Sequence, residues 1–459
     1  MKRNTDMLNG PILPNIIRYT VPIMLTSVLQ LLFNAADLVV VGRYCGSIYV
    51  GAVSATSAII NLIINLFIGL SIGAGVAVAH GLGGEDNETV YKTVHTALPM
   101  ALLGGVILTI IGVIFAEDFL IMMKTPENVL PHSTLYMKIY FCGMVFSMVY
   151  NFCASILRAA GDTKSPLIFL MLSGVINVVL NLIFVTVFHM DVDGVALATI
   201  TSLAISSILV VIALIRRTDA CHLSLRKMRF YKKQLLEIIR IGLPAGIQSS
   251  LFSISNVIIQ SSINSFNSDA IISGNGAAGN IEGFVYVIMN SFHQTAVNFI
   301  GQNDGARKYD RIKKIFVTCL ACVMIVGLIS GVSVWFLGEP LLSIYITDSA
   351  EAISHGIVRL AYIGIPYFLC GLMDVSTGAL RGLGSSVAPM VISVLGVCGI
   401  RIAWIYSIFQ IPQYHTPQYL YLSYTFSWLA TFLIQSAAFI TLYKRKSKAN
   451  QLWNNYYSK

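Results

Sequence analysis

The sequence predicts an all-α polytopic membrane protein, and three observations carry that prediction. Of the 459 residues, 56% are hydrophobic and only 11% are charged, with a mean hydropathy of +0.75. Soluble domains carry about 25% charged residues, so this composition excludes a water-soluble globule. The apolar residues also form long runs, whereas a membrane β-barrel would show short segments of alternating polarity. Finally, landmarks of the first half recur in the second.

Twelve apolar runs are long enough to cross a bilayer, because about 20 apolar residues suffice for a spanning helix. The expected spans are residues 14–42, 48–80, 91–116, 132–158, 165–189, 193–216, 237–266, 270–301, 315–338, 353–381, 387–410 and 417–443. The start of the chain has a basic pair but no small-residue cleavage site after a short apolar core. We therefore expect no cleaved signal peptide, and the first span stays.

The distribution of Lys and Arg predicts the orientation. With the N-terminus in the cytoplasm, 25 of the 30 Lys and Arg fall on the cytoplasmic side. The exceptions are Arg43, Lys124, Lys138 and Arg359 outside, and Arg401 within a span. Cytoplasmic loops carry the excess of Lys and Arg in such proteins. We expect a multi-pass protein of the cell (inner) membrane with both termini cytoplasmic.

The chain repeats itself at an offset of about 222 residues. Ile17-Arg18-Tyr19-Thr20-Val21-Pro22 is similar to residues 239–244, His80-Gly81-Leu82-Gly83 to residues 302–305, and Arg158-Ala159-Ala160-Gly161 to residues 381–384. Six spans per half predict two lobes related by a pseudo-two-fold axis along the membrane normal. The expected boundaries are a lobe at 1–216, a basic linker at 217–236, a lobe at 237–443 and a basic tail at 444–459.

The first span is more than an anchor. Pro22 near its start favours a kink, because proline removes a helical hydrogen bond. Asp37, one turn after Asn34, sits among apolar residues. A carboxylate at that depth costs about 2.5–3.5 kcal/mol even on the lenient insertion scale, so such residues are usually functional. The alternative is an Asp37 exposed to water at the outer helix end.

Five stretches carry a family resemblance across nearly the whole chain. They are Asn34-Ala35-Ala36-Asp37 with Val41-Gly42-Arg43, residues 157–162 (LRAAGD), residues 194–199 (GVALAT), residues 301–306 (GQNDGA) and residues 379–384 (ALRGLG). Together and in order they resemble the multidrug and toxic compound extrusion family, in its DinF-like branch. The resemblance implies two V-shaped six-helix bundles that export organic cations and other amphipathic compounds, driven by inward H⁺ or Na⁺.

The resemblance also implies a coupling site. In similar family members the first-span Asp works with an Asn and an Asp in the fifth span and a Thr in the sixth, which correspond here to Asp37, Asn177, position 181 and Thr199. Position 181 is Asn in this chain, so the first lobe keeps one ionisable group, which weakens a Na⁺ site and leaves proton chemistry at Asp37 intact. In the Na⁺ alternative, oxygens of Asn34, Asp37, Asn177, Asn181 and Thr199 would form a cage.

The second lobe has its own intramembrane polar residues: Gln248, Asn256, Gln260, Glu282, Asn290, His293, Asp374 and Arg401. Glu282 and Asp374 are candidates for a second ion site or for contacts to a cation. Arg401 is the expected ion-pair partner of one of them, because buried charges rarely stand alone. A purely structural ion pair is the open alternative. We expect His293 to be a hydrogen-bonding residue between helices, with a proton relay as the alternative.

Several motifs have simpler explanations. Residues 69–73 (GLSIG) match a hydrolase pattern but lie in a span, which favours small residues for helix packing. Residues 274–279 (GNGAAG) lack a surrounding βαβ unit, and the eight cysteines are typical of small apolar residues in spans. We therefore expect no enzyme, no cofactor beyond the coupling ion, no nucleic-acid partner and a monomer that contacts drugs and lipids. A flippase or exporter of lipid-linked or other endogenous metabolites is the alternative function.

Overall fold

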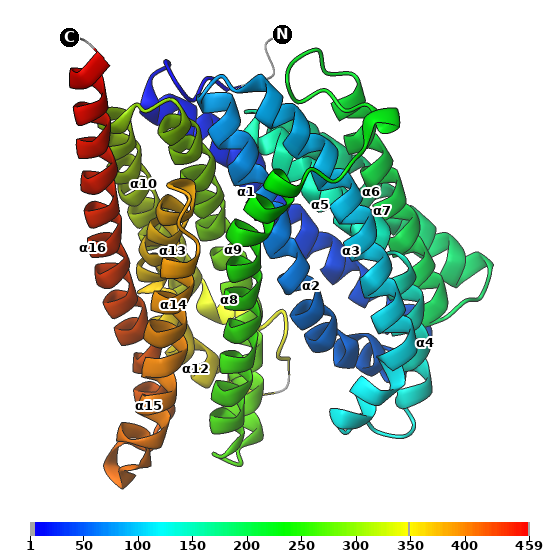
Figure 1. Cartoon of the computed structure of the whole chain (residues 1–459). Coiled ribbons are helices and arrows are strands. Elements are labelled where there is room, and N and C mark those ends of the chain that lie inside the picture. The colour runs from blue at the N-terminus through cyan, green and yellow to red at the C-terminus, as the bar shows by residue number, and fades with distance from the viewer. Residues whose placement is uncertain (1–4, 348, 458–459) are drawn as a thin grey trace. The chain divides into compact units, whose positions relative to one another are not determined.

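The computed structural model describes residues 5–347 and 349–457, and across these residues the chain is helical without a strand (Figure 1). Residues 1–4, 348 and 458–459, which include the N-terminal basic pair and the last tail lysine, lie outside the described residues. Within the described ranges, nine helices are long and apolar enough to cross a membrane, and two bent helix pairs bring the number to 11. The expected all-α polytopic fold is confirmed.

The helices follow the twelve predicted spans in order. Two spans are each a bent pair: α4 (Leu130–Cys142) with α5 (Met144–Ala159), bent by 46°, and α12 (Ala350–Arg359) with α13 (Tyr367–Gly382), bent by 40°. The eighth predicted span, residues 270–301, is α9 (Asp269–Gly305), a 37-residue helix that is less apolar than the other spans. Polar residues inside α9, such as Glu282 and His293, explain its lower hydropathy.

By contacts the chain divides into two compact units. The first unit comprises residues 1–6 and 25–250. It contains α2 (Ser47–Gly83), α3 (Asn87–Met122), α6 (Lys164–Leu182) and α7 (Val192–Ile215), together with the bent pair α4–α5. Its core is built from buried side chains of these helices, including Met137, Phe141, Met148 and Phe152.

The second unit comprises residues 7–24 and 251–459. Besides α9 and the pair α12–α13 it contains α10 (Tyr309–Phe336), the short α11 (Gly338–Leu342), α14 (Val387–Ser393), α15 (Ile400–Tyr406) and α16 (Pro417–Tyr457). Helix α13 lies against α9, α10 and α16 (Figure 1). The largest hydrophobic core of the second unit includes the buried side chains Phe299, Phe316 and Leu380.

Two helices are divided between the units. In α1 (Ile12–Val40) the change falls between Met24 and Leu25, two residues after Pro22, and in α8 (Lys232–Asn264) it falls between Ser250 and Leu251. The first part of α1 packs in the second unit, where Tyr19 meets Phe299 at 5.3 Å between ring centroids. The contact units therefore assign residues 7–24 and 237–250 differently from the predicted lobes.

Glycines bring α2 and the first part of α8 into backbone contact. A Cβ atom on Gly69 would lie 2.2 Å from the amide nitrogen of Gly246, and one on Gly73 would lie 2.3 Å from the carbonyl oxygen of Ile238. The partner helix offers Gly242 at the same spacing from Gly246. Small residues four apart permit this close approach of helices, as predicted for residues 69–73.

The basic linker is folded onto the first unit. The backbone nitrogen of Ser224 donates to His95 Nε2 at 3.0 Å, and that of Tyr231 donates to Thr96 Oγ1 at 3.2 Å. Cys221 and Leu223 are fully buried in the core of the first unit. The linker is therefore ordered and packs against α3.

Candidate functional site

Asp37 lies near the end of α1, and side chains from α6 and α7 gather around its carboxylate. Asn181 Nδ2 donates to Asp37 Oδ1 at 2.5 Å, and Thr199 Oγ1 donates to Oδ2 at 3.4 Å. Asn177 Nδ2 donates to Thr199 Oγ1, and Asn181 Nδ2 also reaches Asn177 Oδ1, both at 3.4 Å. Four predicted site residues thus form one hydrogen-bonded group, called here the Asp37 cluster.

The Asp37 cluster is sheltered but incompletely satisfied. Asp37 is 9% exposed and Asn181 is fully buried. The other amide atom of Asn181, Oδ1, is buried and has no hydrogen-bond partner among the residues that the structure describes. An unpaired buried polar atom costs about 1–3 kcal/mol, so its presence next to a carboxylate calls for an explanation. A proton or cation at this point would supply the missing partner.

The local backbone sets the cluster apart from ordinary helix. A π-helical turn, η1 (Val41–Cys45), begins four residues after Asp37, and another, η2 (Ile183–Val187), begins two residues after Asn181. Such turns are rare and often lie at functional sites. The two turns contact each other within the first unit.

Two tyrosines belong to the surroundings of Asp37 and were missed from the sequence. Tyr136 and Tyr140 of α4 stack at 5.9 Å between centroids, and each interacts electrostatically with Asp37. Their spacing of four places both on one helix face. That spacing was the available signal, but aromatic pairs at helical spacing are common in apolar cores.

Two other predicted residues lie outside the cluster. Asn34 is exposed, and no hydrogen bond joins it to Asp37 in the described part of the chain. Pro22 is buried inside α1, next to the change of unit. The cluster therefore contains one carboxylate, two amides and one hydroxyl.

Glu282 has a basic partner, but it is not the predicted one. Arg359 Nε donates to Glu282 Oε1 at 3.0 Å, and its Nη2 donates to Oε2 at 2.7 Å. Asn275 Oδ1 also accepts from Arg359. The expectation that Arg401 pairs with an acid is therefore wrong. The residue that pairs is Arg359, which ends α12 and is 9% exposed.

Asp374 lies in a separate polar group between α9 and α13. Asn290 forms a side-chain hydrogen bond with Asp374, whose buried Oδ2 has no hydrogen-bond partner in the described part of the chain. His293 Nδ1 contacts the backbone oxygen of Asp374 at 2.7 Å, and its Nε2 lies 3.3 Å from Arg381 Nη1. His293 thus joins the two helices, as expected for a hydrogen-bonding residue.

The remaining second-lobe candidates are scattered. Gln248 is buried but belongs to the first unit, Asn256 is exposed, and Arg401 packs on aromatic rings of α16. The candidates therefore do not form one site. The described residues contain no group of three or more His, Cys, Asp and Glu side chains able to hold a metal ion.

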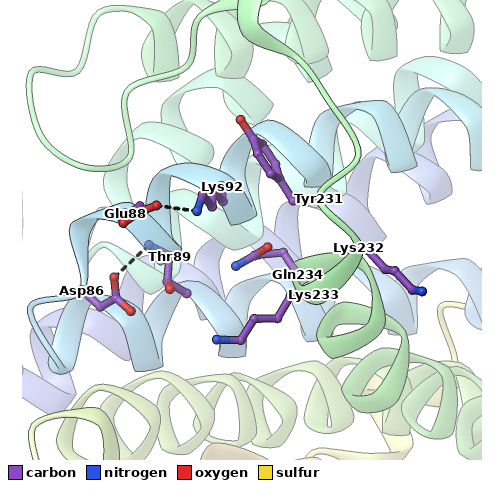
Figure 2. A pocket seen from close by; sticks show the side chains of 8 residues that line it. All are labelled: Asp86, Glu88, Thr89, Lys92, Tyr231, Lys232, Lys233 and Gln234. Carbon is purple, nitrogen blue, oxygen red and sulfur yellow. Dashed lines mark hydrogen bonds and ion pairs between the residues drawn. The ribbon is translucent and has the colours of Figure 1, made fainter.

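A surface pocket of the first unit is lined by Asp86, Glu88, Thr89, Lys92, Tyr231, Lys232, Lys233 and Gln234 (Figure 2). Its acids are already engaged. Asp86 accepts from the backbone of Thr89 at 2.9 Å as the cap of α3, and Glu88 pairs with Lys92. The pocket includes no residue of the Asp37 cluster, and it marks the edge of the docked linker.

Comparison with protein families places both halves of the chain in one group. The family model described as MatE matches residues 22–183 and again residues 244–407. The two matched segments begin at Pro22 and Pro244, so the repeat seen in the sequence is also a repeat of the family unit.

Curated relatives cover most of the chain. The probable multidrug resistance protein YoeA of Bacillus subtilis (strain 168) is 27% identical over 392 residues, 84% of each chain. The probable multidrug resistance protein NorM of Thermotoga maritima is 24% identical over 396 residues, 84% of this chain and 83% of that protein. Both names describe resistance proteins, and the multidrug export protein MepA of Staphylococcus saprophyticus is 23% identical.

Solved structures share the fold. A structure described as the outward-facing conformation of a multidrug resistance MATE family transporter has a TM-score of 0.88 at 20% identity and covers 97% of this chain and 99% of that one. A crystal structure of MATE in complex with MaL6 has a TM-score of 0.90 at 19% identity, over 98% and 100% of the two chains.

Proposed function

Because this chain belongs to the MatE family of multi-pass membrane transporters, we propose that it is a secondary active exporter of organic cations and amphipathic xenobiotics. Export is coupled to inward H⁺, with Na⁺ as the alternative coupling ion. The chain works as a monomer of the DinF-like branch in the inner membrane, with both termini cytoplasmic. No cofactor beyond the coupling ion takes part.

The hydrogen bond from Asn181 to Asp37 carries the proposal. Antiport needs a group that takes either the coupling proton or the cargo, but not both at the same time. Burial favours the protonated acid, whereas a nearby cation and the donors Asn181 and Thr199 favour the carboxylate. A side-chain amide serves both states, because it donates through nitrogen and, after a flip, accepts through oxygen. An asparagine at position 181 can therefore bind Asp37 in both its protonated and its ionised state, which suits proton exchange.

Pro22 is the proposed hinge. Proline leaves the carbonyl of Arg18 without its helical donor. This weakens α1 just before Met24, where the helix passes from the second contact unit to the first. Protonation of Asp37 from outside lets α1 bend near Pro22 and enclose the cargo. Two solved relatives at 19–20% identity are described as MATE in bent and in straight conformations.

Na⁺ remains the rival coupling ion because oxygen atoms converge on Asp37. Asn181 Oδ1 is unpaired, and Asn177 and Thr199 supply further oxygens. Hard cations prefer such ligands. The cluster nevertheless holds a single carboxylate, which favours H⁺.

The test is ethidium export in inverted and right-side-out membrane vesicles with imposed gradients. Export driven by a pH gradient without Na⁺ supports the proposal. Export that requires added Na⁺ at fixed pH replaces H⁺ by Na⁺, and no gradient-driven export with either ion refutes antiport.

A further inference from the structure

Arg401 is a buried cation that no acid neutralises within the described residues. It lies on α15 directly after the π-helical turn η5 (Val394–Gly399) and is 4% exposed. Its only hydrogen bond within that part of the chain runs from Nε to Ser427 Oγ, at 3.0 Å. None of the ion pairs formed there includes Arg401. An uncompensated buried charge is strongly unfavourable, so a partner is expected.

Among the described residues, the two buried acids of the second unit, Glu282 and Asp374, interact with groups other than Arg401. Both carboxylate oxygens of Glu282 accept from Arg359, and Asp374 bonds to Asn290 and interacts with Arg381. Glu282, Arg359 and Arg401 together carry one net positive charge. The described residues therefore supply no counter-charge for Arg401, and a bound anion would provide one.

Aromatic rings hold the guanidinium group of Arg401 in place. Its centre lies 3.9 Å from the ring centroid of Tyr424 and 5.6 Å from that of Trp428. Tyr367 packs on Trp428 at 5.0 Å. Stacking uses the face of a guanidinium and leaves the N–H groups in its plane for ligands, and Nε is already fixed by Ser427. The two Nη groups form the fork that matches a carboxylate or phosphate.

We propose that Arg401, with Tyr424 and Trp428, binds the anionic group, a carboxylate or phosphate, of an amphipathic compound that this exporter carries. The inference rests on the proposed export function and extends its cargo from cations to aromatic anions and zwitterions. The guanidinium group takes the negative charge, and the rings contact the aromatic body of the cargo. A stacked Arg that served only packing would show no preference for charge.

The test uses two probes with one aromatic body and opposite charge, pyrenebutanoate and pyrenebutyl-trimethylammonium. Their binding to the purified full-length protein in nanodiscs is followed by fluorescence anisotropy. We expect Arg401→Gln to weaken binding of the anion at least tenfold and to change binding of the cation less than twofold. Arg401→Lys keeps the charge and retains part of the affinity. The control Arg445→Gln removes an exposed charge of α16 and leaves both affinities unchanged.

Equal losses for the two probes, or a wild type that does not bind the anion, would overturn the proposal. A second measurement covers a variant that fails to fold: pyrenebutanoate should raise the melting temperature of the wild type in a salt-sensitive manner, and no rise counts against the site. Ethidium export by the wild type tests the proposed function separately. If the wild type exports ethidium but Arg401→Gln affects both probes equally, only the anion site is refuted.

The source of the anion is decided by competition. Weaker pyrenebutanoate binding in nanodiscs that contain phosphatidylglycerol assigns the site to a lipid phosphate as well. Displacement by inorganic phosphate shows that a free anion suffices. Binding that neither competitor affects makes the organic anion the ligand. Each of these results supports an anion site at Arg401 and identifies whether a lipid, a free phosphate or an organic compound supplies the anion.

Discussion

Asn181 donates its amide hydrogen to Asp37 over 2.5 Å, although the two residues are 144 positions apart in the chain. The contact joins α1 to α6 in the first unit and leaves Asn181 Oδ1 without a partner. The amide nitrogen of Asn181 is hydrogen-bonded and its oxygen is not, so the amide can adopt two orientations: one that donates to Asp37 and one that accepts from it. The charge state of Asp37 decides between them.

Asp37→Asn should abolish proton-driven export and preserve the fold. Asparagine keeps the size of the side chain and an oxygen that accepts from Asn181, but it cannot exchange a proton. We expect ethidium efflux under a pH gradient to fall to the level of empty vesicles. Asp191→Asn, which alters an exposed acid that accepts from Tyr49, is the control and should retain efflux. Full drug resistance in cells carrying the Asp37 variant would refute the mechanism.

Asn181→Asp should increase the dependence on Na⁺. The change places a second carboxylate next to Asp37, and like charges at that distance need a shared proton or a cation between them. We expect added Na⁺ to stimulate efflux severalfold in the variant and little in the wild type. Asn151→Asp adds a carboxyl group on α5, where Asn151 donates to the backbone oxygen of Ser147 in its own helix, and serves as control. Equal Na⁺ responses in the variant and the wild type would argue against a cation at position 181.

The sequence could predict the Asp37 cluster because its members are polar residues inside apolar helices, where each is costly. The family resemblance supplied the pairing of Asp37 with Asn177, Asn181 and Thr199. The partner of Glu282 was missed for a related reason. Arg359 lies near one end of the predicted span 353–381, so it was counted among the outer basic residues, and only the structure shows that it is buried against Glu282.

The division of α1 and α8 between the contact units was also beyond the sequence. Repeats reveal which segments are equivalent, but they do not reveal which neighbours a helix half touches. The packing of Tyr19 on Phe299 and the glycine contact of α2 with α8 are tertiary facts. The small residues at 69 and 73 did predict a close helix contact, although not its partner.

Breaking the pair of Glu282 and Arg359 should destabilise the second unit strongly from either side. Arg359→Met leaves a buried carboxylate and Glu282→Gln leaves a buried guanidinium, and each should lower the free energy of unfolding by about 3–5 kcal/mol. The double variant should recover most of the loss. Chemical unfolding in detergent measures this cycle, with Glu351→Gln at an exposed pair with His355 as control. Additive losses in the double variant would show that the two side chains act independently.

Gly69→Ala should separate α2 from α8. The added methyl group would lie 2.2 Å from a backbone nitrogen, which cannot move aside as a side chain does. We expect a loss of about 1–3 kcal/mol in the free energy of unfolding. Gly276→Ala in α9 meets no atom within 4 Å and should instead stabilise its helix by about 0.5–1 kcal/mol. Opposite signs for the two variants, measured in the same detergent, are the expected result, and equal gains would contradict the close contact.

Docking of the linker should protect Cys221 from alkylation. Burial raises the pKa of the Cys221 thiol to about 12, and the charge of Asp219 adds to this effect. Only the thiolate reacts, and its fraction at pH 8 is on the order of one in ten thousand for such a pKa. In a variant whose single cysteine is Cys221, maleimide labelling at pH 8 should therefore be slow until denaturant is added. A matched variant with Thr218→Cys as its only cysteine exposes a thiol three residues away and should label rapidly. Similar rates for the two variants in the native state would show that residues 217–231 leave the surface of α3.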